Sequence, residues 1–495
     1  MSSEQLELKE HDESAPKSLK FSLQWILIAI AVGIGIYMVP TPDGLSDRGH
    51  IYLAILIPVV ILWTAEALPV GVTAIGVGAA LALFGAQSVA NAWSPYANRT
   101  VVFVFMIIMM GVIISQTSIP ERILAGVVRL GGRGTTKLSF TLCMAATLLS
   151  AWTHDTAITI ILLYSLVPLF AKMGLTPAKS NNLTKHFLLI VPLGAACGGG
   201  GTFVGSGRSP AAAEMFMAAT GYNIGFGEYA LYCMVPSIIY GIGTWVAVMI
   251  VFPPKVKELP AEAIVSKFPS MTTNEKWIGA LLAFTIGMYC VSDFTGLHVS
   301  IIGTFFIVAC IALSLVSWKK CVEEFPWNPM MVFGAGFSLG VAMLDTGAGK
   351  WLAEQSFVLF EGASWPVVSF GVGWVSAILT SFMANAAATT LLVPVVVPMA
   401  DLAGVPTLPI ALTVPLATTF VLLIIGCPPT LVAYGLGYFT QVEAFKVLLL
   451  RTIICLFLAG AVQSVWWPLV GMPGNLNMMQ TPAKLTMTGT EPIQK

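Results

Sequence analysis

Long apolar runs are the feature that most limits what this sequence can fold into. The runs 23–39, 51–63 and 448–465 hold at most one charged residue each, and they approach or reach the length that crosses a bilayer. Charged residues make up only 10% of the 495 residues, whereas a soluble globular protein carries about 25%. Because so few charges cannot cover a surface that faces water, the chain is predicted to be an all-α membrane protein with many crossings.

The balance of charges and the cysteines exclude several other classes. Lys+Arg and Asp+Glu both number 24, which argues against a basic nucleic-acid-binding surface. The eight cysteines form no CxxC pair and lie mostly in apolar stretches, which predicts buried thiols rather than disulfides or zinc ligands. The first 20 residues hold five acidic residues, unlike a basic signal peptide, so we expect no cleaved signal.

Polar breaks divide the apolar sequence into eleven expected crossings and two stretches of another kind. The stretches 138–171 and 366–400 are each split by a polar tip into arms of about 13 to 16 residues, which is about 20 to 24 Å of helix. Such arms are too short for roughly 30 Å of hydrocarbon, so both stretches are predicted to be re-entrant helical hairpins. The crossings are expected near 23–40, 51–65, 67–86, 101–118, 186–220, 226–252, 277–292, 299–317, 329–346, 406–438 and 447–470.

The basic residues predict which ends of the crossings face the cytoplasm. With a cytoplasmic N-terminus, 18 basic residues, Arg451 among them, fall in cytoplasmic segments and 5 in external ones. This bias satisfies the positive-inside rule and predicts an external C-terminus. Arg208 is left over, inside an interrupted crossing. The predicted divisions outside the repeats are a cytoplasmic tail 1–20, a first crossing within 21–50, a cytoplasmic linker 253–276 and an external tail 471–495.

Two halves of the chain echo each other in architecture. Equivalent points recur at offsets of 229, 230 and 221 residues, in the pairs Gly111 and Gly340, Asp155 and Asn385, and Gly205 and Gly426. Five expected crossings separate equivalent points, and an odd number inverts the second copy. We therefore predict inverted repeats over 51–252 and 277–470, with broken helices at 186–220 and 406–438, a construction typical of secondary transporters. A duplication that only built a scaffold is the alternative.

Four polar patches converge under this symmetry. They are the tips 150–156 and 380–386 and the helix breaks 198–210 and 426–430. Backbone that is not helical is tolerated at membrane depth only where protein or a wet cavity satisfies it. Helix N-termini after a break favour anions, whereas unwound carbonyls favour cations such as Na⁺. The patches are therefore candidate ligands for both.

Three ionisable residues stand out because burying them in a membrane is costly. Asp155 would coordinate a cation or carry a coupling proton; the alternative is a structural tip in which Asp155 caps the next helix. His154 fits a structural hydrogen bond equally well. Arg208 would bind a substrate anion or act as a tethered cation that neutralises Asp155. The alternative for Arg208 is a side chain that snorkels to the membrane interface.

Several motifs carry a resemblance to a known family. They are Thr64-Ala65-Glu66-Ala67-Leu68-Pro69, Phe325-Pro326-Trp327, Phe333-Gly334-Ala335-Gly336, and Pro428-Pro429 followed by Ala433-Tyr434-Gly435. From about residue 50 to residue 471 the chain resembles the divalent-anion:sodium symporter family. The resemblance implies a homodimer in which a moving transport domain works as an elevator against a scaffold. It also implies transport of dicarboxylates, tricarboxylates or sulfate, usually with Na⁺ and sometimes by exchange.

The chain departs from this family at its signature. The family has Ser-Asn-Thr at both hairpin tips, whereas this chain has His154-Asp155-Thr156 and Ala384-Asn385-Ala386. The resemblance therefore carries over only Thr156 and Asn385 at the tips, and Thr380 for a sodium site. The family's Thr-Pro-Pro-Asn break reads Ser206-Gly207-Arg208-Ser209 in the first half and Cys427-Pro428-Pro429-Thr430 in the second.

These patterns together predict a site for an anion and a coupling cation. Asp155 and Arg208 are expected to form an altered ion-coupling half, while Asn385 and the second break hold substrate. The residues expected to bind substrate are Thr156, Arg208, Ser209, Asn385, Pro429 and Thr430. Those expected to couple the ion, with Na⁺ at the Asp155 and Asn385 tips, are Ser150, Thr153, His154, Asp155, Gly205, Ser206, Thr380, Ala384, Asn385, Gly426 and Cys427.

The predicted function is secondary active transport of a small, dicarboxylate-like anion across a bacterial cytoplasmic membrane, coupled to Na⁺ and with no other cofactor. Proton-coupled transport or exchange of a sulfonate or other oxyanion is the alternative. A channel is a competing class because re-entrant hairpins also build pores, but it predicts no accumulation against a gradient. An intramembrane enzyme is a second competing class. The sequence has no cluster with metal-ligand spacing and no second acid placed for a dyad, so no enzymatic activity is expected.

Overall fold

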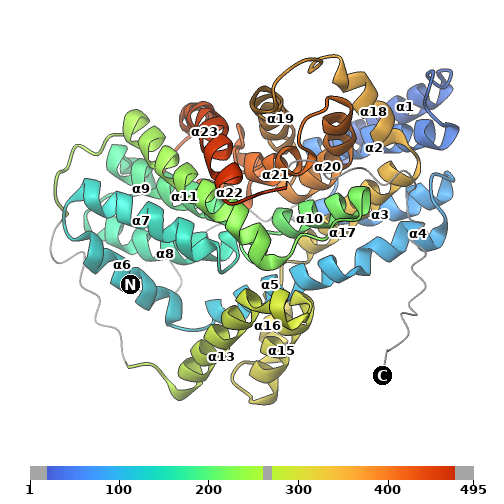
Figure 1. Ribbon diagram of the computed structural model, residues 1–495. Coiled ribbons are helices and arrows are strands. Elements are labelled where there is room, and N and C mark those ends of the chain that lie inside the picture. The colour runs from blue at the N-terminus through green and yellow to red at the C-terminus, as the bar shows by residue number, and fades with distance from the viewer. Residues whose placement is uncertain (1–18, 260–269, 474–495) are drawn as a thin grey trace.

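The computed structural model describes residues 19–259 and 270–473, and within them the fold is all helical apart from one isolated bridge between Gly134 and Glu258. Figure 1 shows helices over the whole described chain. The predicted tails 1–20 and 471–495 lie almost entirely outside the described residues, as does the middle of the predicted linker 253–276. The prediction of an all-α chain is thus confirmed for the described part.

The first half contains ten described α-helices and then α11, which is the longest of this half. They are α1 (Leu19–Met38), α2 (Asp47–Ala65), α3 (Val70–Leu83), α4 (Val89–Trp93), α5 (Arg99–Ser115), α6 (Ile119–Gly131), α7 (Thr135–Ser150), α8 (Asp155–Lys172), α9 (Asn182–Gly199) and α10 (Arg208–Thr220), followed by α11 (Phe226–Val251). Hence α7 and α8 lie in the stretch predicted to be the first hairpin, and α9 and α10 lie in the crossing predicted to be broken.

The second half repeats this order. Its helices are α13 (Thr273–Cys290), α14 (Ser292–Thr295), α15 (Val299–Ala312), α16 (Trp318–Glu323), α17 (Trp327–Asp345), α18 (Ala348–Phe357), α19 (Trp365–Thr380), α20 (Asn385–Leu402), α21 (Thr407–Ala417), α22 (Pro428–Gly435) and α23 (Gln441–Leu469). Here α19 and α20 lie in the stretch predicted to be the second hairpin, and α21 and α22 lie in the second crossing predicted to be broken. Figure 1 shows α19, α21 and α23 side by side, whereas α22 lies nearer the middle of the molecule.

The hairpin arms are not all as short as the sequence analysis predicts. The first arms, α7 and α19, have 16 residues each, but the second arms, α8 and α20, have 18. At the helical rise 18 residues extend about 27 Å. Both second arms are therefore among the eight described helices that are long and apolar enough to cross a membrane. Arm length does not separate them from crossings, so the re-entrant hairpins and the eleven crossings stay predictions.

Glycines let the tips touch the broken helices. A Cβ on Gly198, near the end of α9, would overlap the carbonyl oxygen of Thr147 in α7, and a Cβ on Gly426 would overlap that of Thr380 in α19. Only a residue without a Cβ allows backbones to approach this closely. In each half the first hairpin arm is therefore packed directly against a broken helix, which brings tip and break together.

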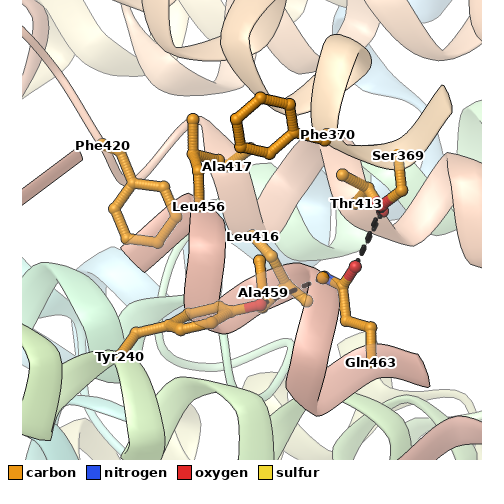
Figure 2. A pocket seen from close by; sticks show the side chains of 11 residues that line it. Tyr240, Ser369, Phe370, Thr413, Leu416, Ala417, Phe420, Leu456, Ala459 and Gln463 are labelled. Carbon is orange, nitrogen blue, oxygen red and sulfur yellow. Dashed lines mark hydrogen bonds between the residues drawn. The ribbon is translucent and has the colours of Figure 1, made fainter. Parts of the chain in front are cut away.

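A buried polar network holds the second hairpin in place. Figure 2 shows Ser369 of α19, Thr413 of α21, Gln463 of α23 and Tyr240 of α11 around one small pocket. The Ser369 and Thr413 hydroxyls are 2.7 Å apart, Ser369 donates to Gln463 Oε1 at 3.0 Å, and Gln463 Nε2 donates to Tyr240 Oη at 3.0 Å. A satisfied buried network of this kind specifies one packing arrangement. It joins α19 to three other helices as one packed unit.

Candidate functional site

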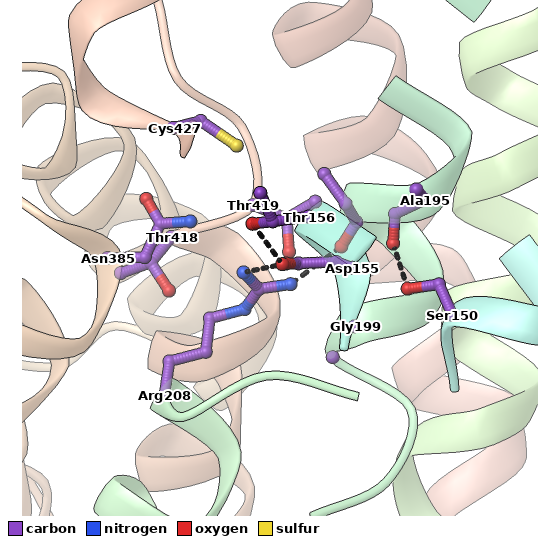
Figure 3. A network of polar contacts seen from close by, with 12 residues as sticks. Ser150, Asp155, Thr156, Ala195, Gly199, Arg208, Asn385, Thr418, Thr419 and Cys427 are labelled. Atoms are coloured by element: carbon purple, nitrogen blue, oxygen red, sulfur yellow. Dashed lines mark hydrogen bonds and ion pairs between the residues drawn. The ribbon is translucent and has the colours of Figure 1, made fainter. Parts of the chain in front are cut away.

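Residues from the four predicted polar patches lie close together in the structure. The Asp155 backbone N–H in the first tip donates to the carbonyl of Gly205 in the first break at 3.0 Å. In the second half the Ser381 hydroxyl accepts from the Leu422 N–H at 2.7 Å. Arg208 contacts residues of both tips. Figure 3 shows side chains from these patches facing a common centre.

The first tip presents a carboxylate at a helix start. His154 is the N-cap of α8, and its Nδ1 accepts from the Thr156 N–H at 3.4 Å. Asp155 is therefore the first helical residue and not the cap, which corrects the structural alternative considered for it. The Thr156 hydroxyl donates to Asp155 Oδ1 at 3.2 Å, and the Asp155 side chain is 4% exposed. The positive end of α8 stabilises this buried carboxylate.

Arg208 is the first residue of α10, and its guanidinium is completely buried. Nη1 lies 3.5 Å from Asp155 Oδ2, and Nη2 donates to the carbonyl of Ala196 in α9 at 2.6 Å. Within the described residues Nε has no hydrogen-bond partner. A snorkelling arginine keeps its head in water, so complete burial contradicts that alternative and favours the pairing with Asp155.

Asn385 is the first residue of α20 and links the second tip to Arg208. Its amide is satisfied at both ends when the oxygen accepts from Arg208 Nη1 at 3.0 Å. The nitrogen then donates to the carbonyls of Gly426 at 2.7 Å and Thr418 at 3.2 Å, and to the Thr380 hydroxyl at 2.7 Å. The Arg208 guanidinium therefore bridges the two tips.

Some of the other predicted residues have buried side chains, and others begin or cap helices. Ser150, Ser206, Ser209, Cys427 and Thr430 are buried, and the Ser150 and Ser209 hydroxyls donate to carbonyls at the end of α9, those of Ala195 at 2.5 Å and Gly199 at 3.2 Å. Pro429 begins α22 with Pro428, and Ala384 is the N-cap of α20.

The hydroxyls of two predicted residues donate to nearby backbone carbonyls. Thr153 donates to the Leu149 carbonyl at 2.9 Å, within its own hairpin arm. Thr430 donates to the carbonyls of Cys427 at 2.7 Å and Ile424 at 3.0 Å. In this conformation both side chains satisfy local backbone groups instead of facing Arg208.

The second break begins earlier than the sequence analysis predicts. Instead of 426–430, the break follows the end of α21 at Ala417, and α22 already begins at Pro428. The Thr418 carbonyl therefore accepts from Asn385 and the Thr419 carbonyl from Arg451, although neither residue is among those predicted. The sequence feature that could have indicated these two residues is that they form a pair of threonines within an apolar run.

Arg451 lies beside the second break and not in a cytoplasmic segment, which corrects that assignment. It is ten residues into α23, about 15 Å along the helix, and is fully buried. Its Nε donates to the Thr244 hydroxyl at 2.9 Å, Nη1 to the Thr419 carbonyl at 3.0 Å and Nη2 to the Leu193 carbonyl at 3.1 Å. These oxygens take the place of water around the guanidinium.

The buried charges of the site are unbalanced. Among the residues that the structure describes, the buried acidic and basic residues other than histidine are Asp155, Arg208 and Arg451. Two cations thus accompany one anion. A buried excess of positive charge is costly unless it is compensated, so the region is suited to an anion.

Comparison with known proteins agrees with this geometry. A family model described as the sodium:sulfate symporter transmembrane region matches residues 21–473. The chain belongs to the sodium:sulfate symporter family. Members of this family are transporters, so the resemblance stated from the motifs is confirmed, and the chain is a multi-pass membrane transporter of a sodium-coupled anion symporter family.

Individual relatives of this symporter-family chain are distant but cover most of its length. An uncharacterized transporter of Haemophilus influenzae is 25% identical over 84% of this chain and 91% of its own length. The sodium-dependent dicarboxylate transporter SdcS of Staphylococcus saprophyticus is 22% identical over 80% of this chain and 82% of its own. SdcS of Staphylococcus aureus is 23% identical over the same shares.

A solved structure shares the fold of this symporter-family chain. It is that of Neisseria gonorrhoeae MtrF, described in terms of a class of antimetabolite efflux pumps, and it aligns with a TM-score of 0.50 at 13% identity over 93% of this chain and 97% of MtrF. At that identity the likeness concerns the fold alone.

Proposed function

We propose that the chain is a Na⁺-coupled secondary transporter of a small, dicarboxylate-like anion, which binds between the two tips and the two helix breaks. The observation that carries the proposal is the meeting of three helix starts. Asp155, Arg208 and Asn385 are the first residues of α8, α10 and α20, and Arg208 contacts the other two. The positive ends of three helices and a guanidinium therefore face one place, which favours an anion.

The helix starts also have donors to offer. In the described chain no side chain caps α10, α20 or α22, whose N-cap residues are Gly207, Ala384 and Cys427. The first backbone N–H groups of a helix have no partner inside the helix. Those at the start of α20 are thus supporting evidence for carboxylate binding at the second tip. In α10 the Ser209 N–H already donates to the Ser206 carbonyl at 3.2 Å, and Pro210 has no N–H.

The coupling ion would use the oxygens that the breaks release. The carbonyls of Thr418 and Gly426 lie at the second tip, where they accept from Asn385. Unwound carbonyls of this kind coordinate Na⁺ in secondary transporters. The relatives named sodium-dependent dicarboxylate transporters support both Na⁺ and the dicarboxylate class. The proposal retains the inverted repeats, the elevator movement, the homodimer and the cytoplasmic N-terminus in a bacterial inner membrane.

Uptake of labelled succinate into proteoliposomes tests the proposal. An inward Na⁺ gradient should drive transient accumulation above equilibrium, and replacing Na⁺ by choline should abolish it. Unlabelled succinate in excess should compete. Flux that never exceeds equilibrium in any gradient would indicate a channel instead.

Proton-coupled transport is the second candidate because a titratable pair lies at the first tip. His154 Nδ1 is 3.3 Å from Asp155 Oδ1, and the His154 side chain is 21% exposed. A proton could therefore reach the buried carboxylate from outside. Accumulation of a sulfonate or other oxyanion driven by a pH gradient without Na⁺ would favour this candidate over the first.

A further inference from the structure

The Arg208 guanidinium lies among oxygen atoms that would suit a metal cation. Three oxygens from three elements face it: the Ala196 carbonyl at 2.6 Å, the Asn385 amide oxygen at 3.0 Å and an Asp155 carboxylate oxygen at 3.5 Å. Carbonyl, amide and carboxylate oxygens are the ligands that hard cations prefer. The side chain thus fills a cation-binding environment with a cation of its own.

The geometry leaves little room for Arg208 to act mainly on substrate. Nη1 and Nη2 both contact protein oxygens, so the bidentate fork that arginine offers to a carboxylate is already engaged. Only Nε lacks a partner in the described structure. Gly199 also confines the pair, since a Cβ there would lie 2.8 Å from Asp155 Oδ2 and 3.1 Å from Arg208 Nη2.

We infer that Arg208 is a built-in cation that takes the position of one coupling ion in the first half of the site. The inference rests on the proposed function, because a coupling ion is needed for the comparison. Since arginine keeps its charge at every accessible pH, the Asp155 half needs no mobile cation. The mobile Na⁺ is then confined to the second half, near the Thr418 and Gly426 carbonyls, and fewer ions accompany each anion.

Removing the charge of Arg208 tests this inference on the purified protein, with thermal stability measured instead of transport. In Arg208→Gln the Asp155 carboxylate and the Ala196 carbonyl lose their cation, so the first half should acquire Na⁺ binding. Its Tm should rise by about 3 °C more than that of the wild type between choline chloride and 0.5 M NaCl. Asp155→Asn combined with Arg208→Gln should lose this gain, and Arg208→Lys should respond as the wild type does.

Two further variants sharpen the test. Arg451→Gln is the matched control, because Arg451 is equally buried but contacts carbonyl, hydroxyl and thiol groups and, among the described residues, no carboxylate. This variant should gain no Na⁺ response. Arg208→Ala should be stabilised by millimolar guanidinium chloride, which restores the missing cation, whereas the wild type should not.

Uptake kinetics connect the inference to transport. The Na⁺ dependence of anion uptake by Arg208→Gln should show a Hill coefficient larger than the wild-type value by about one. If Arg208→Gln keeps the wild-type Na⁺ response and loses only anion affinity, Arg208 is a substrate ligand and the inference is wrong.

Failure of the proposed function would look different. Gained Na⁺ stabilisation in Arg208→Gln, with no Na⁺-driven uptake by the wild type, would refute the coupling and retain the built-in cation. Should Arg208→Gln not purify as folded protein, Asp155→Asn gives the same decision. Its uncompensated Arg208 should raise the Na⁺ concentration for half-maximal stabilisation at least threefold, whereas an unchanged value overturns the inference.

Discussion

Replacing Arg451 by methionine should destabilise the transporter and slow transport together. The arginine makes three hydrogen bonds to oxygens at 2.9 to 3.1 Å, and these connect α23 to α11, to α9 and to the second break. Its guanidinium also lies over the Phe420 ring, 5.3 Å from the centroid. Methionine keeps much of the apolar stem and removes only the charge and the donors.

The magnitude follows from two opposing contributions. Hydrogen bonds from a charged donor contribute about 1.5 to 3 kcal/mol each, so three of them contribute about 5 to 9 kcal/mol. Removing a buried charge also recovers several kcal/mol of desolvation. The net loss is therefore about 2 to 4 kcal/mol, which lowers the Tm by about 2 to 4 °C if the unfolding entropy per residue resembles that of globular proteins.

The functional effect arises at the second break. Without Arg451 the Thr419 carbonyl loses its donor, and the neighbouring Thr418 carbonyl, which accepts from Asn385, is held less firmly. Initial anion uptake in proteoliposomes should fall about tenfold, because small displacements of positioning groups are costly. Arg451→Lys keeps the charge and should retain part of both properties. If Arg451→Met matches the wild type in Tm and in uptake, Arg451 does not hold the break.

Three further predictions concern the second tip, the helix contact and the polar network. Asn385→Ala removes the link between Arg208 and the Gly426 carbonyl, so uptake should fall by more than tenfold, by about 1.4 kcal/mol or more; unchanged anion KM and kcat would contradict this. Gly198→Ala should destabilise by about 3 kcal/mol in thermal unfolding because its Cβ meets α7, whereas Gly287→Ala, in open space, should be neutral. Gln463→Leu should cost about 1 to 3 kcal/mol, and more than Tyr240→Phe; equal stabilities would exclude a structural role for the network.

Local reasoning predicted the helices and the polar patches well because it depends on short segments. The apolar runs match helices of the structure, and Asp155 and Asn385 both stand at helix starts. The same reasoning was wrong for the second hairpin arms and for the second break. The segment 418–427 contains no residue that strongly disfavours a helix before Gly426. Hydrogen bonds from Arg451 and Asn385 to its carbonyls stabilise the non-helical backbone there.

The sequence by itself determined that this chain is a helical membrane protein, because 10% charge cannot solvate a folded surface of this size. It also identified Asp155 and Arg208 as charged residues that fall within segments predicted to lie in the membrane. Only the tertiary structure decided that Arg208 is fully buried between the two tips and that Arg451 lies inside the protein. The reason is that a buried guanidinium needs oxygens from several distant segments, and only the packed chain brings these together.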